Sequence, residues 1–280
     1  MIIKQKLNMI GGGFQHDICS SALNKNKYVE WMKDNSAPVS IYIDNAILGN
    51  TDKTKVNYGW LAESSAIIPD TIKIILSNLT LFKEKYTFIF THDRRLIDVS
   101  PQFFKFVVPN AKPWIQNKNL YKKTKLTSFI GSNKIYCIGH SYRQQMISKY
   151  KDVVDHYGRG FYGKELPWTY IENNVEESGK LIGLKDYMFS IVMENDNYDD
   201  IFCEKITDCF AAGTIPVYWG TKNIKNYFDI NGIIILDDKF EINMLTKEIY
   251  YSKIEHIKNN FNKCHELLTS EDYMVLNHIK

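Results

Sequence analysis

The sequence has few cysteines and no arrangement of them that is typical of a site. Its 280 residues contain five cysteines, at positions 19, 137, 203, 209 and 264, and no C-x-x-C pair. This odd number and wide spacing indicate neither a disulfide framework nor a structural zinc site. We therefore expect reduced thiols and a cytoplasmic location.

The sequence also lacks an excess of charge of one sign and any long apolar segment. It has 35 basic and 32 acidic residues, which give a net charge of +3. Nucleic-acid-binding domains usually carry a basic stripe, so this balance argues against a nucleic-acid partner. No apolar segment reaches the roughly 20 residues of a membrane-spanning helix, and we expect no such segment.

What the sequence does contain is a series of short apolar runs between polar or glycine-rich loops. Most runs are nearly continuous, as in strands that are covered on both faces of a parallel sheet. The runs cover residues 39–43, 58–62, 86–90, 104–108, 126–130, 153–157, 187–193, 214–219 and 233–236. Helical stretches at 141–150 and 202–212 lie between them. This alternation in both halves predicts an α/β fold with two Rossmann-like, doubly wound domains.

The domain boundary is predicted between residues 109 and 125. This stretch has two prolines, five lysines and little apolar periodicity, which is typical of an exposed connector. We expect an N-terminal domain over residues 1–115, a C-terminal domain over 123–250 and a helical segment over 251–280.

The most informative segment covers residues 187–220, YMFSIVMENDNYDDIFCEKITDCFAAGTIPVYWG. An apolar strand ends at Glu194-Asn195, and after a polar loop a helix is predicted to begin near Asp200. Gly213 is placed to end this helix. The loop follows the carboxyl end of a strand, which is the edge where open α/β sheets bind ligands.

The first turn of the predicted helix suits a phosphate group. Its free backbone N–H groups and the positive end of its dipole attract an anion, and Lys205 adds a full positive charge. Glu204 cannot bind a phosphate, but its carboxylate accepts hydrogen bonds from ribose hydroxyls. The alternative is that Glu204 only complements the helix dipole, as acids in a first helical turn commonly do.

A second polar cluster precedes this segment. Ser132 and Asn133 follow the run 126–130, so we expect them at the same sheet edge as Asn195. Arg143, in the next helix, suits bidentate binding of a diphosphate oxygen, although by itself it would be interpreted as a solvated surface arginine. The sequence VDHYGRG at 154–160 closes the following strand.

Together these elements resemble one enzyme family. The chain contains S-N, then an arginine, V-D-x-Y-G-R-G, E-N followed after eight residues by E-K, and G-x-I-P-V-Y-W-G. Their order and spacing are similar to those of the α1,3-fucosyltransferases, glycosyltransferase family 10, and the match covers roughly residues 123–240. The resemblance implies a GT-B fold, in which two Rossmann-like domains face a cleft. It also implies an N-terminal acceptor-binding domain and a C-terminal domain that binds a GDP-sugar, ordinarily GDP-fucose.

Carried over by position, the resemblance implies that Arg143 and Lys205 grip the diphosphate, Asn195 contacts the nucleotide and Glu204 holds the ribose. The run 213–220 would wall the donor pocket. The expected donor-binding residues are Ser132, Asn133, Arg143, Tyr157, Gly158, Glu194, Asn195, Glu204, Lys205 and Tyr218.

Two positions depart from the family pattern. Many members have a Tyr three residues before the Glu that corresponds to Glu204, and a Ser or Thr directly before it. This chain has Ile201 and Cys203 there, which leaves strict specificity for GDP-fucose open. The tail after residue 240 is short, which suggests a compact bacterial, phage or viral enzyme.

In the N-terminal half, Glu63 is the candidate general base. The run 58–62 places its carboxylate at the carboxyl end of a predicted strand, and the family's base is a Glu in a corresponding place. The alternative is that Glu63 caps the turn or helix that begins at Ser64, and Asp17 and His92 are the reserves. The run Gly11-Gly12-Gly13 predicts a tight turn, because a dinucleotide fingerprint would need glycine where His16 stands.

Three functions stay open. The leading hypothesis is an inverting glycosyltransferase that transfers fucose from GDP-fucose to a hydroxyl of an acceptor glycan. The second keeps the fold but uses another nucleotide-sugar donor, and the third is a catalytically silent nucleotide-sugar or glycan-binding protein. No D-x-D triplet occurs, which is the motif with which many sugar transferases of the other common fold hold a metal–diphosphate. We therefore expect no metal ion and no other cofactor.

Overall fold

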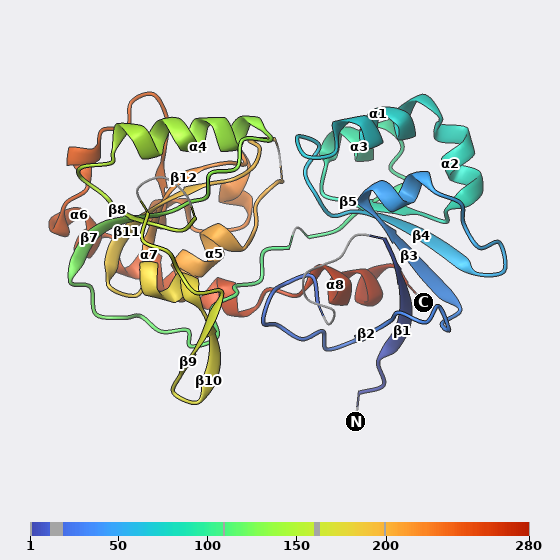
Figure 1. Cartoon of the computed structure of the whole chain (residues 1–280), viewed down its shortest axis with the longest axis horizontal. Helices are drawn as coiled ribbons and strands as arrows, with labels where there is room; N and C mark the ends of the chain where they lie inside the picture. The colour runs from blue at the N-terminus through green and yellow to red at the C-terminus, as the bar shows by residue number, and fades with distance from the viewer. Residues whose placement is uncertain (1, 12–18, 109, 160–162, 199, 280) are drawn as a thin grey trace. The chain divides into compact units, whose positions relative to one another are not determined.

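The computed structural model describes residues 2–11, 19–108, 110–159, 163–198 and 200–279. The chain forms two compact units, each built on a parallel sheet with helices around it (Figure 1). Unit 1 consists of Met1–Asn110, Asp199–Ile201 and Leu268–Lys280. Unit 2 consists of Ala111–Tyr198 and Phe202–Leu267.

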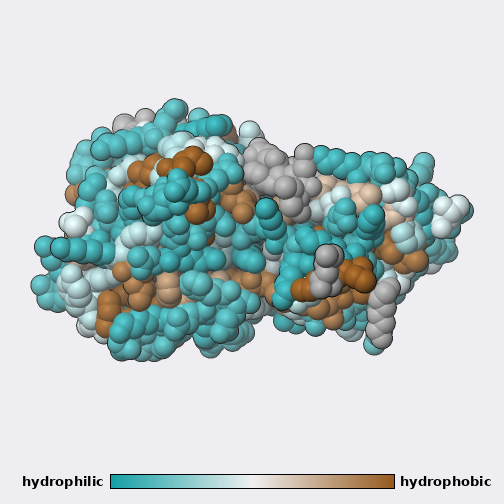
Figure 2. All heavy atoms as spheres, turned by 90° about the horizontal axis from the view of Figure 1, so that it is seen from below, coloured by the Kyte–Doolittle hydropathy of each residue, from teal (hydrophilic) through white to brown (hydrophobic). Residues whose placement is uncertain are grey.

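Among the residues described, no helix is long and apolar enough to span a membrane. The longest of these helices, α4 (Ile138–Lys149) and α7 (Ile254–His265), have 12 residues each, whereas a span needs about 20. The face of the molecule shown in Figure 2 is mainly hydrophilic, and its hydrophobic residues form small separate groups.

Unit 1 contains a six-stranded parallel sheet in the order β2-β1-β3-β4-β5-β6. Its strands are β1 (Gln5–Ile10), β2 (Val29–Met32), β3 (Val39–Ile43), β4 (Val56–Leu61), β5 (Ile89–Thr91) and β6 (Phe104–Phe106). Its helices are η1 (Asp44–Leu48), α1 (Pro69–Ser77), α2 (Leu79–Lys85), α3 (Arg94–Val99) and α8 (Ser270–Asn277). Ile41 of β3 shares a core with Met274 of α8, and the next residue, Tyr42, shares another with Ile75 of α1. Both faces of the sheet are therefore covered, as in a doubly wound domain.

Unit 2 contains a five-stranded parallel sheet in the order β13-β12-β11-β7-β8. Its strands are β7 (Lys125–Ile130), β8 (Asp155–Tyr157), β11 (Tyr187–Met193), β12 (Ile215–Trp219) and β13 (Ile234–Ile235), and a separate antiparallel hairpin joins β9 (Thr169–Glu172) to β10 (Val175–Ser178). The remaining elements are α4, α5 (Glu204–Ala211), α6 (Lys247–Ser252), α7, η2 (Gly179–Gly183), η3 (Ile224–Asn226), η4 (Ile230–Gly232) and η5 (Ile242–Met244). Phe210 of α5 and Met146 of α4 lie in different cores, one on each face of the sheet. The strand order reverses between β7 and β11, which is where such sheets bind ligands.

The two-domain α/β prediction is confirmed, and all nine predicted runs overlap strands of the two sheets. The sequence does not predict β1, β2 or the hairpin β9–β10. In β1 the polar residue Asn8 breaks the apolar pattern, yet it is buried. Its Nδ2 donates to the carbonyl of Ala37 at 2.8 Å and to Oγ of Ser40 at 3.0 Å. Hydrogen bonds to β3 and to the residues just before it thus allow a polar residue to be buried in the core.

The helix α5 begins at Glu204, four residues later than the predicted start near Asp200. Asp200 has a left-handed backbone with φ 63°, and Cys203 is extended with φ −143°, so neither is helical. The predicted end is confirmed, because Gly213 has φ 69° directly after the C-cap residue Ala212.

The stretch 109–125 is not the exposed connector that its composition predicts. Ala111 and Ile115 are buried in the core that contains α5, and the N–H of Ile115 donates to Oδ1 of Asp208 on that helix at 3.2 Å. Lys123 is buried too, and its Nζ donates to the carbonyl oxygen of Ala212 at 2.6 Å. The lysine thus binds a carbonyl at the end of α5, an interaction that composition alone does not reveal.

The helical segment 251–280 is divided between the two units. The helix α7 packs against α5 in unit 2, whereas α8 belongs to unit 1. Oε1 of Glu271 accepts the N–H of Ser20 at 2.6 Å, and Oδ1 of Asp272 accepts the N–H of Tyr28 at 2.8 Å. These two buried carboxylates attach α8 to the segment between β1 and β2.

Candidate functional site

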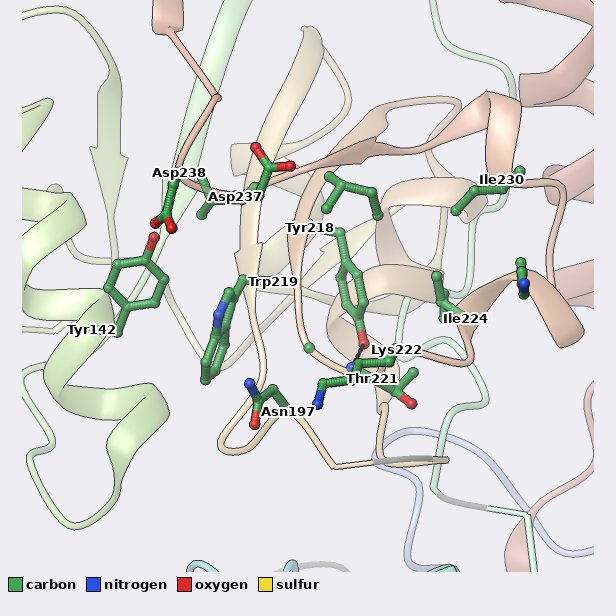
Figure 3. A pocket seen from close by; sticks show the side chains of 14 residues that line it. Tyr142, Asn197, Tyr218, Trp219, Thr221, Lys222, Ile224, Ile230, Asp237 and Asp238 are labelled. Atoms are coloured by element: carbon green, nitrogen blue, oxygen red, sulfur yellow. Dashed lines mark hydrogen bonds between the residues drawn. The ribbon is translucent and has the colours of Figure 1, made fainter.

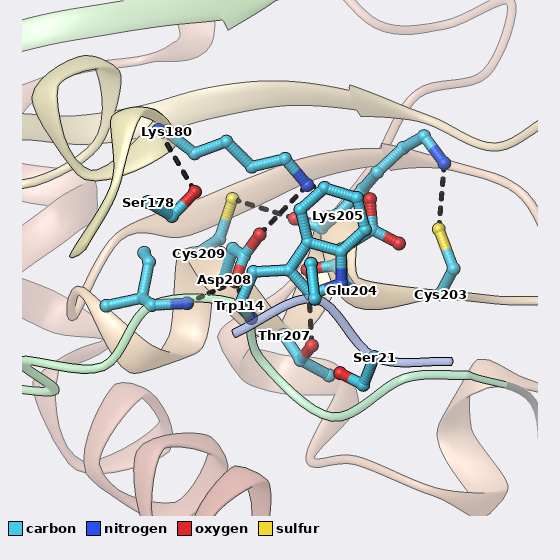
Figure 4. A network of polar contacts seen from close by, with 12 residues as sticks. Ser21, Trp114, Ser178, Lys180, Cys203, Glu204, Lys205, Thr207, Asp208 and Cys209 are labelled. Atoms are coloured by element: carbon cyan, nitrogen blue, oxygen red, sulfur yellow. Dashed lines mark hydrogen bonds and ion pairs between the residues drawn. The ribbon is translucent and has the colours of Figure 1, made fainter. Parts of the chain in front are cut away.

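The centre of the candidate site is Glu194, which follows β11 at the carboxyl edge of the unit 2 sheet. Its side chain is buried, and its Oε1 accepts the N–H of Cys203 at 3.0 Å. Its Oε2 accepts from Sγ of Cys203 at 3.0 Å and from Nζ of Lys205 at 3.4 Å. Burial and the charge of Glu194 raise the pKa of the Cys203 thiol, which therefore stays protonated and acts as a donor. Figure 4 shows that Lys205 and Cys203 also contact each other.

Arg143 and the start of α4 close this cluster from the other side. Arg143 is only 5% exposed, and its Nη2 donates to the carbonyl of Met193 at 2.9 Å. The N–H of Gly139 donates to the carbonyl of Asn195 at 3.1 Å, and a Cβ on Gly139 would lie 2.1 Å from the carbonyl oxygen of Glu194. The helix therefore rests directly on the loop after β11. These contacts exclude the interpretation of Arg143 as a solvated surface arginine.

His140, which the sequence did not indicate, lies beside several cationic side chains of this cluster. His140 lies in the first turn of α4 and is buried. Burial lowers its pKa to about 4, and the charges of Arg143, Lys134 and Lys205 act in the same direction. The imidazole is therefore neutral, and its Nδ1 accepts the N–H of Tyr136 at 3.2 Å. His140 therefore adds no charge of its own to the cluster near pH 7.

Glu204 lies beside this cluster at the N-terminus of α5 and is bound by a second lysine. Its Oε1 accepts from Nζ of Lys180, on η2, at 2.7 Å. Burial alone would raise the pKa of Glu204, but the charges of Lys180 and Lys205 outweigh it and lower the pKa to about 2. The carboxylate is therefore ionised and can accept hydrogen bonds. The sequence gives no signal for Lys180, because it lies 24 residues before its partner.

Tyr157 and Tyr218 are buried, and both hydroxyls have partners within unit 2. The hydroxyl of Tyr157 contacts that of Tyr187, the first residue of β11, at 2.7 Å, so it points away from the carboxyl edge. The hydroxyl of Tyr218 accepts the N–H of Thr221 at 3.2 Å and supports the loop after β12.

Ser132, Asn133 and Gly158 follow β7 and β8 at the carboxyl edge, as the sequence predicts. Ser132 is half-buried and Asn133 is exposed. Gly158 has φ 107°, and a Cβ there would lie 2.0 Å from the carbonyl oxygen of Gly131. The residue is thus needed for the close approach of the two strand ends, which is a structural role.

A pocket of about 550 Å³ adjoins the cluster within unit 2 (Figure 3). Trp219 lies edge-on to Tyr142 of α4, with ring centroids 5.3 Å apart. Figure 3 shows Asp238 near the hydroxyl of Tyr142. Gly220 forms the wall shared with the cluster, because a Cβ there would lie 2.6 Å from Cγ of Glu194. Aromatic faces beside carboxylates suit a nucleobase or a sugar ring.

In unit 1, Glu63 follows β4 and its side chain is exposed, not shielded by its apolar neighbours. Its backbone N–H donates at 3.0 Å to Oδ1 of Asp44, which follows β3. Burial raises the pKa of Asp44 to about 6, and the charge of Glu63 contributes to the rise. The N-cap of α1 is Ile68, so Glu63 does not cap that helix.

Of the two reserve candidates for the base, the structure describes His92, which lies in the same unit. His92 follows β5 and is buried. Burial lowers its pKa to about 4 despite the charges of Asp93 and Asp200, so it is neutral near pH 7. Asp93 has a structural role, because its Oδ1 accepts the N–H of Arg95 and caps α3. Asp17 and His16 lie outside the described residues, whereas Gly11 has φ 79°, as a tight turn requires.

The described residues contain no group of three or more His, Cys, Asp or Glu side chains that could hold a metal ion. Within the unit 2 cluster, Lys180 pairs with Glu204 and Lys205 with Glu194, and the charge of Glu194 also acts on Arg143. Of the ten expected donor-site residues, the structure gathers Arg143, Glu194, Glu204 and Lys205 around the start of α5. Asn195 lies next to this group, and its carbonyl accepts the N–H of Gly139 at the start of α4.

Comparison with known proteins identifies relatives of the chain. Residues 120–268, more than half of the chain, match the family described as glycosyltransferase family 10 (fucosyltransferase) C-term. Putative fucosyltransferase R654 of Acanthamoeba polyphaga mimivirus is 22% identical over 235 residues, which are 80% of this chain and 37% of that protein. GDP-fucose protein O-fucosyltransferase 3 of Xenopus tropicalis is 30% identical over 102 residues, which are 36% of this chain and 21% of that protein. The chain thus spans well under half the length of either relative.

Two solved structures share the fold. An α1,3-fucosyltransferase crystallised with GDP superposes with a TM-score of 0.50 and 12% identity, over 95% of this chain and 82% of that one. TarM superposes with a TM-score of 0.50 and 13% identity, over 85% of this chain and 53% of that one. At such low identity the likeness shows the fold alone, which is the GT-B architecture of two parallel α/β units. By its sequence match the chain belongs to glycosyltransferase family 10, the fucosyltransferase family.

Proposed function

We propose that the chain transfers fucose from GDP-fucose to a hydroxyl group of an acceptor glycan, with inversion at the anomeric carbon. The observation that carries this proposal is the charge cluster at the carboxyl edge of unit 2, where Arg143 and Lys205 lie near Glu204 at the start of α5. The family match and the names of the relatives, two of which are fucosyltransferases, support it.

In this proposal the cluster holds the diphosphate. Arg143, Lys205 and the N-terminus of α5 provide the positive charge that stabilises the leaving group as its negative charge develops. Nζ of Lys205 lies 3.4 Å from Glu194, a long contact that a phosphate oxygen can replace or share. Oε1 of Glu194 still accepts the N–H of Cys203, whether the phosphate replaces or shares the lysine contact. Because these groups can balance a diphosphate, the proposed reaction uses no divalent metal.

The rest of the donor is assigned to neighbouring groups. Glu204 is ionised and accepts hydrogen bonds from the ribose hydroxyls. The pocket behind Gly220, with Trp219 and Tyr142 in its wall, has room for a ring of the donor. Tyr157 is not included, because its hydroxyl contacts Tyr187 at the opposite end of the sheet.

The proposed chemistry is one direct displacement. The acceptor oxygen attacks the anomeric carbon of fucose, the bond from that carbon to the diphosphate oxygen breaks, and the acceptor proton passes to a base. We assign the base to Glu63, because its carboxylate at the end of β4 is exposed and therefore accessible to an acceptor. Oδ1 of Asp44 accepts the backbone N–H groups of Ala62 and Glu63, so it fixes the backbone from which the Glu63 side chain extends.

The experiment that tests the function separates donor choice from turnover. A thermal-shift series with GDP, UDP, CMP, dTDP and their sugars should give the largest increase in Tm with GDP and GDP-fucose, because a ligand that binds only the folded state stabilises it. Fucose release from GDP-fucose is then measured with and without acceptor glycans. Preference for another nucleotide would favour the second function, which Ile201 and Cys203 keep open. Tight GDP binding without turnover of any GDP-sugar would indicate a binding protein.

A further inference from the structure

Lys180 occupies an unusual position between two carboxylates and an aromatic ring (Figure 4). Its Nζ lies 2.7 Å from Oε1 of Glu204 and 3.1 Å from Oδ2 of Asp208. The same nitrogen lies 3.8 Å from the centroid of the Trp114 ring, within the range of a cation–π contact. The family resemblance assigns no role to Lys180, and the displacement proposed above does not use it.

The charges in this group are strongly coupled. Burial by itself would lower the pKa of Lys180, but the charges of Glu204 and Asp208 more than compensate and raise it. The pKa of Glu204 is about 2, so the lysine and this glutamate are both charged near pH 7. Their side chains are 21% and 11% exposed, so water screens this pair much less than a surface pair.

The position of the ammonium group is fixed by its other contacts. Asp208 is 1% exposed, and its Oδ1 accepts the backbone N–H groups of Trp114 at 2.7 Å and Ile115 at 3.2 Å. Its Oδ2 is therefore held in place to bind Lys180, and the Trp114 ring covers the nitrogen from another side. Glu204 consequently has one carboxylate oxygen bound to a cation that cannot easily move.

We propose that Lys180 is a positioning residue for ribose recognition, which holds Oε1 of Glu204 so that the carboxylate presents its other oxygen to the ribose hydroxyls. The inference rests on the proposed function, because it assumes a nucleotide whose ribose meets Glu204. A fixed carboxylate loses less conformational entropy when it binds, so Lys180 increases the preference for a ribose that carries its hydroxyls.

The test compares Lys180→Met with the parent protein on two ligands, GDP and 2′,3′-dideoxy-GDP, by isothermal titration calorimetry. Methionine keeps an unbranched side chain against Trp114 and removes the charge. The parent should bind GDP about tenfold more tightly than the dideoxy compound, since an unsatisfied charged acceptor is costly. In Lys180→Met this ratio should fall close to one. If the substitution acted only by removing a positive charge, the affinities for GDP and for the dideoxy compound would fall by the same factor, and their ratio would not change.

The matched control is Lys185→Met. Lys185 lies in the same segment of the chain, but its Nζ pairs with Oε1 of Glu172 at 2.8 Å. This control variant should keep the parent ratio. If Lys180→Met does not fold, Lys180→Arg is measured instead, and its longer planar group should displace the carboxylate and reduce the ratio.

Three results distinguish this inference from the proposed function. A parent that does not bind GDP contradicts the proposed function itself. A parent that binds both ligands equally, or a Lys180 variant that keeps the full parent ratio, overturns the inference and leaves the proposed donor standing.

Discussion

The carboxyl edges of the two sheets differ in how their charged groups are arranged. In unit 2, Glu194 and Glu204 are buried and are bound by Lys205 and Lys180. In unit 1, Glu63 is exposed, and the neighbouring carboxylate of Asp44 accepts backbone N–H groups. An interlocked set of charges offers a fixed arrangement to a polyanion. The exposed carboxylate of Glu63 is instead accessible to a second substrate, and the proposed function assigns the donor to the first edge and the acceptor to the second.

The largest expected effect concerns the edge of unit 1. Glu63→Gln keeps the shape of the side chain and removes the base, so kcat with GDP-fucose and acceptor should fall by about 10²–10⁴-fold. The Kd for GDP should remain close to that of the parent. Asp70→Asn, an exposed acid in the first turn of α1, is the control and should leave kcat unchanged. If the Glu63→Gln enzyme had nearly the parental kcat, Glu63 would not be the base, and the two edges would not differ as proposed. The base would then be sought among Asp44, His92 and Asp17.

The next effect concerns the edge of unit 2. Arg143→Ala and Lys205→Ala should each raise the Kd for GDP about tenfold or more, because each removes a charged partner of the diphosphate. Calorimetry measures the affinity, and Tm shows whether the fold survives the loss of the buried Arg143. Lys149→Ala, in the exposed last turn of α4, should change neither. Parental affinity in either variant would remove that residue from the donor site.

A smaller effect is expected from the pH dependence of stability at Asp44. Its folded-state pKa, about 6, lies above its ordinary value, so the folded state holds this proton more tightly than the unfolded state. The resulting stabilisation is present at pH 4 and is lost as the pH rises through 6. Asp44→Asn does not titrate, so its Tm relative to the parent should increase between pH 4 and pH 7. A Tm difference that stays constant over this range would show that Asp44 titrates normally.

The smallest effect should come from removing metal ions. If Arg143, Lys205 and the N-terminus of α5 balance the leaving diphosphate, excess chelator should leave the initial rate of fucose transfer within about twofold of the untreated rate. Loss of activity in chelator that added Mg²⁺ or Mn²⁺ restores would contradict the proposal. It would also show that the charge balance of the unit 2 edge is incomplete.

The fold was predictable because the strands of a parallel sheet are buried on both faces. In the sequence such strands are short, continuous apolar runs, which are less typical of other elements of that length. The edge positions of Glu194 and Asn195 follow from the same pattern, since each stands directly after such a run. Lys180 was not predictable, because it contacts Glu204 only through the packing of η2 against α5. The exposure of Glu63 was also beyond the sequence: Trp60 and Leu61 are buried within β4, whereas Glu63 lies past its end.

The attachment of α8 has a consequence for the order of folding. Ser20 is bound to Glu271 across 251 positions of sequence, and Met274 completes a core that begins at Leu7. Closing so long a loop is entropically costly, and the core cannot be complete until residues 268–279 have been synthesised. All residues of unit 2 precede α8 in the sequence and are synthesised before it. Unit 1 therefore cannot complete its core before the residues of unit 2 have been synthesised.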